Sequence, residues 1–204
     1  MNPARKQIAS GVLGPKKQEH SSNEPVNLWY GKRCSRDEKE LKIASTRCRV
    51  AADSGRTLAG NDDPFCIYFA QGRCSAGYEC RYQHRIPNEA DERALTVTHD
   101  IFGRDRFGSD RGDMGGIGTF SRENRTLYAG RVPTDRQGRD LEEAARRQFG
   151  EFGAIDYVRV LQGRNCLFVK FRLRACAEFA REALMCQVRG RCCCRSAGGA
   201  EGCR

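Results

Sequence analysis

The chain has 204 residues, of which 39% are apolar and 30% are charged. A chain of this composition buries a core over only part of its length, so we expect small modules. The 36 Lys and Arg residues outnumber the 26 Asp and Glu residues and give a formal net charge of +10. This excess attracts polyanions and favours a nucleic acid as the partner.

Neither export nor membrane insertion is expected. No stretch approaches the roughly 18 consecutive apolar residues of a membrane span. The opening residues, MNPARKQIASGVLGPKKQEH, lack the apolar core of a signal peptide. We therefore expect an intracellular protein without a membrane partner. Its 12 cysteines are then reduced thiols, and metal binding is the first hypothesis for them.

The N-terminal half divides into four segments by composition. Residues 1–26 are polar, lack periodicity and are predicted to form a disordered basic arm. Residues 27–63 have too few apolar residues for an independent core and must pack on a neighbour. Residues 64–87 are dense in cysteine and aromatic residues, and residues 88–124 form a Gly/Arg-rich connector.

The connector interleaves basic and aromatic residues, among them Arg104, Arg106 and Phe107. A connector of this length is unusual unless it is functional or disordered. Arginines neutralise phosphates and aromatic rings stack on bases, so this pattern favours contact with RNA or with the neighbouring domains. We predict that these three residues contact RNA.

The cysteine-rich segment has the spacing C-x7-C-x5-C-x3-H, formed by Cys66, Cys74, Cys80 and His84. Thiolates and imidazole are the ligands that tetrahedral zinc prefers, so we predict one structural zinc ion. The alternative is a set of reduced thiols beside a surface histidine. Within this finger, Tyr68, Tyr78 and Tyr82 are predicted to present their rings to unstacked bases, whereas Phe69 is predicted to pack against the finger.

A zinc enzyme would need an open coordination position and a nearby general acid or base. The H-x-E and C-x-x-C pattern of nucleobase deaminases is absent from the sequence. A closed site of three thiolates and one imidazole is structural, so we expect a protein that is not an enzyme.

Residues 125–186 have regular periodicity. Strands are predicted at 126–131, 155–161 and 166–171, with one helix opened by Asp140 and a second helix after the last of these strands. The second helix has an apolar stripe of Cys176, Phe179, Ala180, Ala183 and Leu184. The order β-α-β-β-α is the split βαβ plan without its last strand.

Two strands of this domain resemble the signatures of an RNA recognition motif. The run 127–132 resembles RNP2 and the run 164–171 resembles RNP1. Strand alternation places Tyr128 and Phe168 together on an exposed face, where two bases can stack. Arg164 and Lys170 of the RNP1 segment are predicted to contact the same RNA. Cys166 occupies a position that is usually aromatic, so one stacking ring is lost.

Residues 187–204 contain no alternating apolar run and are predicted to form a disordered Cys/Gly tail. The expected fold class is α+β. A small zinc-stabilised module packs on a ferredoxin-like RNA recognition motif that lacks a clear last strand.

The sequence resembles the nineteen-complex RNA-binding splicing factor family, in which a Torus module, a CCCH finger and an RNA recognition motif follow one another. The resemblance rests on the runs NLWYGK, TRCRVAADSG, FCIYFAQGRC, YECRYQHRIP, THDIFGRDRF, RGDMGGIGTFSRENRTLYAGR and RNCLFVKFRLRACAEFAREAL. It implies that residues 27–63 are a Torus-like segment that packs, with the finger, on the RNA recognition motif.

The resemblance also implies a function. Proteins of this family contact U6 snRNA and pre-mRNA near the 5′ splice site and shape the RNA catalytic centre of the spliceosome. The expected partners are these RNAs and nineteen-complex proteins, and the expected location is the nucleus. We expect a monomer within a large assembly.

Two other functions stay open at this point. One is a CCCH regulator of messenger RNA, although Ala76 stands where such fingers usually place an aromatic residue. The other is a protein-interaction scaffold with a degenerate RNA recognition motif, against which the retention of Tyr128 and Phe168 argues.

Overall fold

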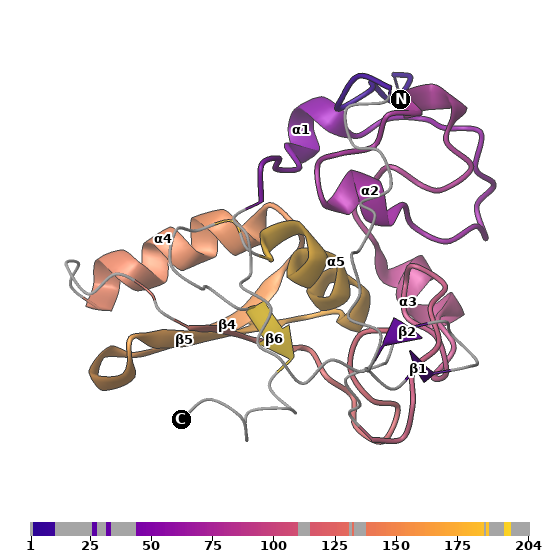
Figure 1. Ribbon diagram of the computed structural model, residues 1–204. Helices are drawn as coiled ribbons and strands as arrows, with labels where there is room; N and C mark the ends of the chain where they lie inside the picture. The colour runs from indigo at the N-terminus through magenta and orange to yellow at the C-terminus, as the bar shows by residue number, and fades with distance from the viewer. Residues whose placement is uncertain are drawn as a thin grey trace.

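A computed structural model describes residues 2–10, 26–27, 32–33, 44–109, 115–130, 132, 138–185, 187 and 194–196. Figure 1 shows two parts, an N-terminal lobe of loops and short helices and a C-terminal sheet with two long helices. Among the described residues, no helix combines the length and the apolar character that a membrane crossing requires.

The C-terminal part contains the predicted β-α-β-β-α order. Its elements are β3 (Thr126–Gly130), α4 (Gly138–Gly150), β4 (Ile155–Leu161), η2 (Gln162–Arg164), β5 (Cys166–Phe171) and α5 (Arg174–Leu184). The sheet order is β4-β5-β3-β6, with antiparallel pairs throughout. The α+β prediction is confirmed.

The sheet has a short fourth strand at the position where the sequence predicted no clear last strand. Strand β6 (Cys194–Ser196) pairs antiparallel with β3, with Cys194 opposite Ala129 and Ser196 opposite Leu127. A strand this short needs no alternating apolar pattern, because backbone pairing along the open edge of β3 is enough to place it. The remainder of the predicted tail, apart from residue 187, lies outside the described residues.

Helices α4 and α5 cover the same face of the sheet, as Figure 1 shows. The inner face of the strands is apolar, with Leu127, Val169 and Phe171 at 2% exposure or less. All members of the predicted apolar stripe of α5 are buried. Apolar residues recur every second position in the strands and about every 3.6 positions in the helix. Both sets of apolar side chains therefore face the same core.

The N-terminal lobe has little regular structure. Its elements are β1 (Val26–Asn27), β2 (Lys32–Arg33), α1 (Val50–Asp53), α2 (Ile67–Ala70), η1 (Gly77–Glu79) and α3 (Glu89–Ala94). Helix α3 begins with a capping box, in which Asn88 accepts from the backbone of Asp91 and Asp91 accepts from the backbone of Asn88. Elements this short depend on tertiary contacts for their stability.

The first residues of the chain are part of this lobe, so the predicted disordered arm is corrected at 2–10. The Ala4 amide donates to the Arg56 carbonyl at 2.9 Å, and the Arg56 amide donates to the Asn2 carbonyl at 2.8 Å. Ala4 is buried. A polar sequence without periodicity can still be ordered when a neighbouring segment satisfies its backbone groups. Residues 11–25 lie outside the described residues.

Asp53, which is 2% exposed, holds this N-terminal segment in place. Its carboxylate accepts hydrogen bonds from Arg5 Nε at 2.6 Å, Gln7 Nε2 at 2.9 Å and the Arg49 amide at 2.8 Å. Burial raises the pKa of Asp53, but these hydrogen bonds outweigh it and hold the pKa below its ordinary value. The buried charge is thus compensated by donors from the distant N-terminal segment and by the nearby Arg49 amide.

The N-terminal lobe and the RNA recognition motif share one aromatic cluster centred on Phe179 of α5. The Phe179 side chain is fully buried. Four rings surround it at centroid distances of 5.8–6.4 Å, namely Phe65, Phe69, Phe102 and Phe152. Because three of these rings belong to the N-terminal lobe and connector, the two parts form one core.

Two glutamates of α5 add polar contacts to the same junction. Glu178 accepts from the Ile101 amide at 2.9 Å and pairs with Arg174 at 3.3 Å. Glu182 accepts from Gln71 Nε2 at 2.9 Å and from Arg104 Nη2 at 3.1 Å. Both glutamates are buried, so losing one partner would leave a buried charge uncompensated.

Substituting Phe179 tests the shared core. We expect Phe179→Ala to lower the free energy of unfolding by about 3–5 kcal/mol and to speed amide exchange in both parts. The matched control is Phe149→Ala, which removes a buried ring that packs on Phe171. Hydrogen exchange should show the control loosening the RNA recognition motif first. Faster exchange confined to the C-terminal part in Phe179→Ala would contradict a common core.

The stability of the junction should depend on pH through Glu178. Burial raises the pKa of this carboxyl from 4.5 to about 7, although Arg174 lowers it. A raised folded pKa favours the protonated form, so the stability contributed by Glu178 falls as pH rises between these values. In urea unfolding, we expect the stability of Glu178→Gln relative to wild type to increase as the pH rises from 4.5 to about 7. Glu143→Gln, at an exposed position, is the control. A stability difference between Glu178→Gln and wild type that does not change with pH would contradict the prediction.

Candidate metal centre and nucleic-acid interface

The predicted ligands Cys66, Cys74, Cys80 and His84 come together in the N-terminal lobe. Their ligand atoms all lie within 4.8 Å of one another, and all four residues are buried. In a tetrahedral zinc site with bonds of about 2.3 Å, ligand atoms are separated by roughly 3.8 Å. The four ligand atoms therefore need to move only slightly closer to one another to bind one metal ion.

Local backbone structure places the cysteines. Cys66 is the N-cap of α2, and its Sγ accepts from the Phe69 amide at 3.3 Å. Gly72 lies between the first two ligands with φ of +71°, where a Cβ would clash with the backbone of Arg47 and Cys48. Gly77 precedes Cys80 with φ of +58°, and its Cβ would meet the Lys6 amide nitrogen at 2.9 Å. Glycine is required at both turns.

His84 is fixed by its neighbour in the core. Its ring stacks on Phe69 with centroids 4.6 Å apart and an interplanar angle of 9°, which confirms that Phe69 packs inside the finger. Both ring nitrogens are buried without a nitrogen or oxygen hydrogen-bond partner in the described part of the chain. A buried imidazole without such a partner, beside three sulfurs, fits a metal ligand.

The crowded sulfurs also shift the protonation of the cluster. Hydrogen bonds from Cys66 and Cys80 hold the pKa of Cys74 below its ordinary value, whereas those to Cys74 and Cys80 raise the pKa of Cys66. Burial lowers the pKa of His84, but Cys74 and Cys80 outweigh it and raise the value to about 9. Negative charge therefore collects on sulfur, where a divalent cation would be stabilised.

The N-terminal segment closes this centre from outside. The Cys74 amide donates to Gln7 Oε1 at 2.8 Å, and the Gln7 amide donates to the Cys74 carbonyl at 2.8 Å. The Gln7 carboxamide also donates to the Phe69 carbonyl at 3.2 Å. These contacts hold a ligand-bearing loop from a segment about 67 positions away in the sequence, and no local pattern in the sequence indicates them.

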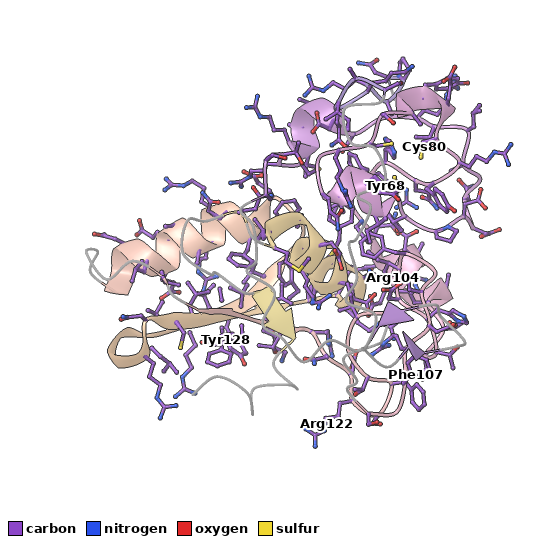
Figure 2. All side chains as sticks on the ribbon, viewed as in Figure 1. Tyr68, Cys80, Arg104, Phe107, Arg122 and Tyr128 are labelled. Atoms are coloured by element: carbon purple, nitrogen blue, oxygen red, sulfur yellow. The ribbon has the colours of Figure 1, made fainter. Side chains whose placement is uncertain are left out.

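The second candidate surface is the face of the sheet that α4 and α5 leave uncovered. Tyr128 and Phe168 are cross-strand partners there, with ring centroids 5.5 Å apart and an interplanar angle of 57°. Both are half-buried, so part of each ring is accessible. Figure 2 shows Tyr128 on the side of the sheet opposite the helices. The structure thus brings these predicted stacking residues together.

The other predicted residues of this face differ in their surroundings. Lys170 pairs with Asp156 at 3.1 Å, and its Nζ lies 5.6 Å from the Tyr157 ring centroid. Arg164 is exposed at the end of η2. Cys166, which alternation places outward, is only 4% exposed. The Tyr128 ring extends toward Gly130 of the same strand, where a Cβ would meet the Tyr128 hydroxyl at 2.7 Å. Gly130 is the cross-strand partner of Cys166.

The two connector arginines predicted to contact RNA also make contacts within the fold, and Arg106 is buried whereas Arg104 stays partly exposed. Arg106 is 4% exposed and donates to the Val97 carbonyl at 3.1 Å and to the Thr119 carbonyl at 2.5 Å. Arg104 pairs with Asp100 at 2.8 Å and with Glu182. The fold therefore uses these donors, since a buried guanidinium needs partners. Phe107 is partly exposed and pairs through its backbone with Thr119.

The finger presents exposed tyrosines beside arginines. Tyr82, a predicted stacking residue, is 49% exposed. Two further tyrosines lie under guanidinium groups, with Arg73 5.0 Å from the Tyr68 centroid and Arg56 5.8 Å from the Tyr78 centroid. The sequence indicated Tyr68 and Tyr78 as candidate stacking rings, but it did not indicate which arginines lie over them.

Sequence reasoning also missed a cavity on the uncovered face. It lies at the β4 side and is lined by Arg122, Glu123, Asn124, Thr126, Tyr157, Arg159, Leu161 and Phe168. The alternation of side chains along β4 could have indicated this cavity, because it places Tyr157, Arg159 and Leu161 on the same face as Phe168.

Comparison with known proteins identifies the N-terminal lobe. The family model of the Torus domain matches residues 1–104. The chain belongs to the Torus domain family. The match extends beyond the Torus-like segment predicted at 27–63, in keeping with the packing of residues 2–10 against residues 55–56. The Torus domain therefore includes the metal centre.

The relatives of this Torus protein are named as splicing factors. A pre-mRNA-splicing factor cwc2 from Dictyostelium discoideum is 45% identical over 91% of this chain and 35% of its own length. The cwf2 protein of Schizosaccharomyces pombe is 41% identical over 89% of this chain and 47% of its own length. The chain thus spans less than half of these relatives, and the predicted family resemblance is confirmed.

Removing one metal ligand tests the centre. A bound structural metal is worth roughly 10–16 kcal/mol in finger peptides, so Cys74→Ser should lose metal and unfold residues 64–87. The control is Cys48→Ser, which removes a buried thiol outside the cluster. Elemental analysis and circular dichroism before and after chelation give the measurement. Less than about half a metal ion per wild-type chain would contradict a structural site.

Proposed function

We propose that this chain is a non-enzymatic RNA-binding component of the spliceosome, located in the nucleus. It binds U6 snRNA and pre-mRNA near the 5′ splice site and helps to shape the catalytic RNA centre. The observation that carries the proposal is the Tyr128 and Phe168 ring pair on the uncovered face of the sheet. The splicing-factor names of its relatives support the same function.

The uncovered face has the chemistry that single-stranded RNA requires. Two half-exposed rings on adjacent strands contribute nothing to the core beneath the helices, but each can stack on a base at about 1–3 kcal/mol. Lys170 and Arg164 lie on or beside the same strand and supply positive charge. The net charge of +10 attracts the phosphate backbone from a distance.

The metal in this proposal is one structural zinc ion held by Cys66, Cys74, Cys80 and His84. Bound zinc would supply a cross-link between the segments that carry these four residues. The chain's own residues then orient Tyr82 and the neighbouring tyrosines at the surface of the finger. Because the four ligands fill a tetrahedral site, the centre leaves no position for substrate.

The assembly partners in this proposal are nineteen-complex proteins, with the chain acting as a monomer within a larger particle. Phe179 fixes the finger relative to the sheet, so one RNA can contact both without a flexible joint between them. An RNA that spans both surfaces would gain affinity from each of them.

Filter binding to U6 stem-loop RNA over a range of salt concentrations tests the function. Tyr128→Ala and Phe168→Ala should each weaken binding by about 1–3 kcal/mol at every salt concentration. Their salt slopes should match the wild-type slope, because stacking releases no counterions. The ring-preserving Tyr128→Phe is the matched control and should bind nearly as wild type.

The alternatives predict different results. A scaffold whose sheet binds a peptide would show unchanged RNA affinity in both alanine variants. A messenger RNA regulator that reads through its finger would lose affinity in Tyr82→Ala and keep it in the sheet variants. Either result would overturn the proposed role of the sheet, provided that metal content and thermal unfolding stay at wild-type values.

A further inference from the structure

The cavity on the uncovered face is a place where a ligand could be enclosed. Its volume is about 520 Å³, within the roughly 300–1,000 Å³ typical of small-molecule sites. Its walls come from two distant segments, the end of the connector at residues 122–124 and strand β4. Thr126 and Phe168 provide part of its lining from β3 and β5.

The position of Tyr128 explains why this end of the face is hollow. The Tyr128 ring extends toward Gly130, away from Thr126 at the other end of β3. In the sheet register, Thr126 is opposite Lys170, and Lys170 is opposite Tyr157. Because the Thr126 side chain is small and the Tyr128 ring points toward Gly130, there is room beside Tyr157.

Tyr157 gives this face a third aromatic ring. Its side chain is 44% exposed, and the irregularity between Ile155 and Tyr157 shifts the register of the strand at this point. Lys170 Nζ lies 5.6 Å from the Tyr157 ring centroid, so positive charge is adjacent to the ring. RNP1 lacks a ring at Cys166, and Tyr157 supplies one at the opposite end of the sheet.

The charge around the cavity suits phosphate. Arg122 and Arg159 are exposed, and neither forms an ion pair with another residue in the described part of the chain. The carboxylate of Glu123 is already paired with Arg125 at 3.2 Å. Figure 2 shows Arg122 projecting away from the body on the Tyr128 side of the sheet.

We propose that this cavity is a nucleotide subsite for single-stranded RNA. Tyr157 stacks on a base, Arg122 and Arg159 contact the flanking phosphates, and Asn124 hydrogen-bonds to a base edge. The RNA therefore passes from the Tyr128 and Phe168 rings toward β4 and the connector, not toward the end marked by Cys166. This inference rests on the proposed RNA-binding function and adds a residue set outside both RNP signatures.

RNA fits this cavity better than a peptide segment does. A peptide docked there would be expected to place apolar side chains against a continuous apolar wall. Here the polar lining consists of two arginines, the Glu123 carboxylate, a carboxamide and a hydroxyl, and the apolar lining comes from two aromatic rings and Leu161. Exposed rings interleaved with unpaired arginines are the pattern of single-strand binding surfaces.

Fluorescence anisotropy with a labelled single-stranded oligouridylate tests the subsite in the metal-loaded full chain. Tyr157→Ala should weaken binding roughly 5- to 150-fold, and Tyr157→Phe should stay within about 2-fold of wild type, because the ring is kept. The double variant Arg122→Gln with Arg159→Gln should reduce the salt slope by about 1.4. Arg147→Gln, exposed on α4 over the other face of the sheet, is the charge control and should leave the slope unchanged.

Cross-linking separates direct contact from indirect effects. With 4-thiouridine in the oligomer, the peptide carrying Tyr157 should be cross-linked, and mass spectrometry would locate it. If Tyr128→Ala weakens binding while Tyr157→Ala binds as wild type, the subsite is wrong and the proposed function stands. If neither substitution weakens binding, the RNA-binding function itself fails. Unchanged RNA binding in Tyr157→Ala would also point to a protein segment as the occupant.

Discussion

The burial of the Phe179 ring is the interaction on which the rest of the structure depends. Rings from the finger, the connector and the RNA recognition motif all pack on it, at 5.8–6.4 Å between centroids. Buried rings of both parts meet at Phe179, so the two parts share one core. The metal centre adds a second constraint, because Phe69 stacks on the ligand His84 and also contacts Phe179. Metal binding and docking of the two parts are therefore physically linked.

The shared core also decides which charges are available to a ligand. Asp100, Glu178 and Glu182 are buried at the junction, and a buried carboxylate is tolerated only with donors around it. Arg104, Arg174 and Arg181 supply several of these donors. Arg106 donates instead to the backbone carbonyls of Val97 and Thr119. Positive charge in the connector is thus partly used in folding, whereas arginines such as Arg122 and Arg159 face solvent. A count of basic residues alone cannot make this distinction.

The two candidate surfaces differ in how they are made rigid. The finger is held by ligand geometry, by two glycines with positive φ and by the Gln7 contacts to the Cys74 loop. The uncovered face of the sheet is held by strand pairing and by the core beneath it. Stacking on a base costs less when the ring is already positioned. Tyr128 and Phe168 are positioned in this way by cross-strand contact, and Tyr157 by the adjacent strand and by Lys170.

The sequence by itself determined the features that depend on neighbours along the chain. The spacing of Cys66, Cys74, Cys80 and His84 predicted the buried cluster that could hold a metal ion. Alternation in β3 and β5 placed Tyr128 and Phe168 on one face. The bounds of β4 and β5 also followed from periodicity. Only the tertiary structure decided the packing of residues 2–10 on the Torus domain, the pairing of β6, the burial of Arg106 and the cavity beside Tyr157. Periodicity is a local property, whereas the partner of a charge, a strand edge or a ring comes from segments that are distant in sequence and meet only in the fold.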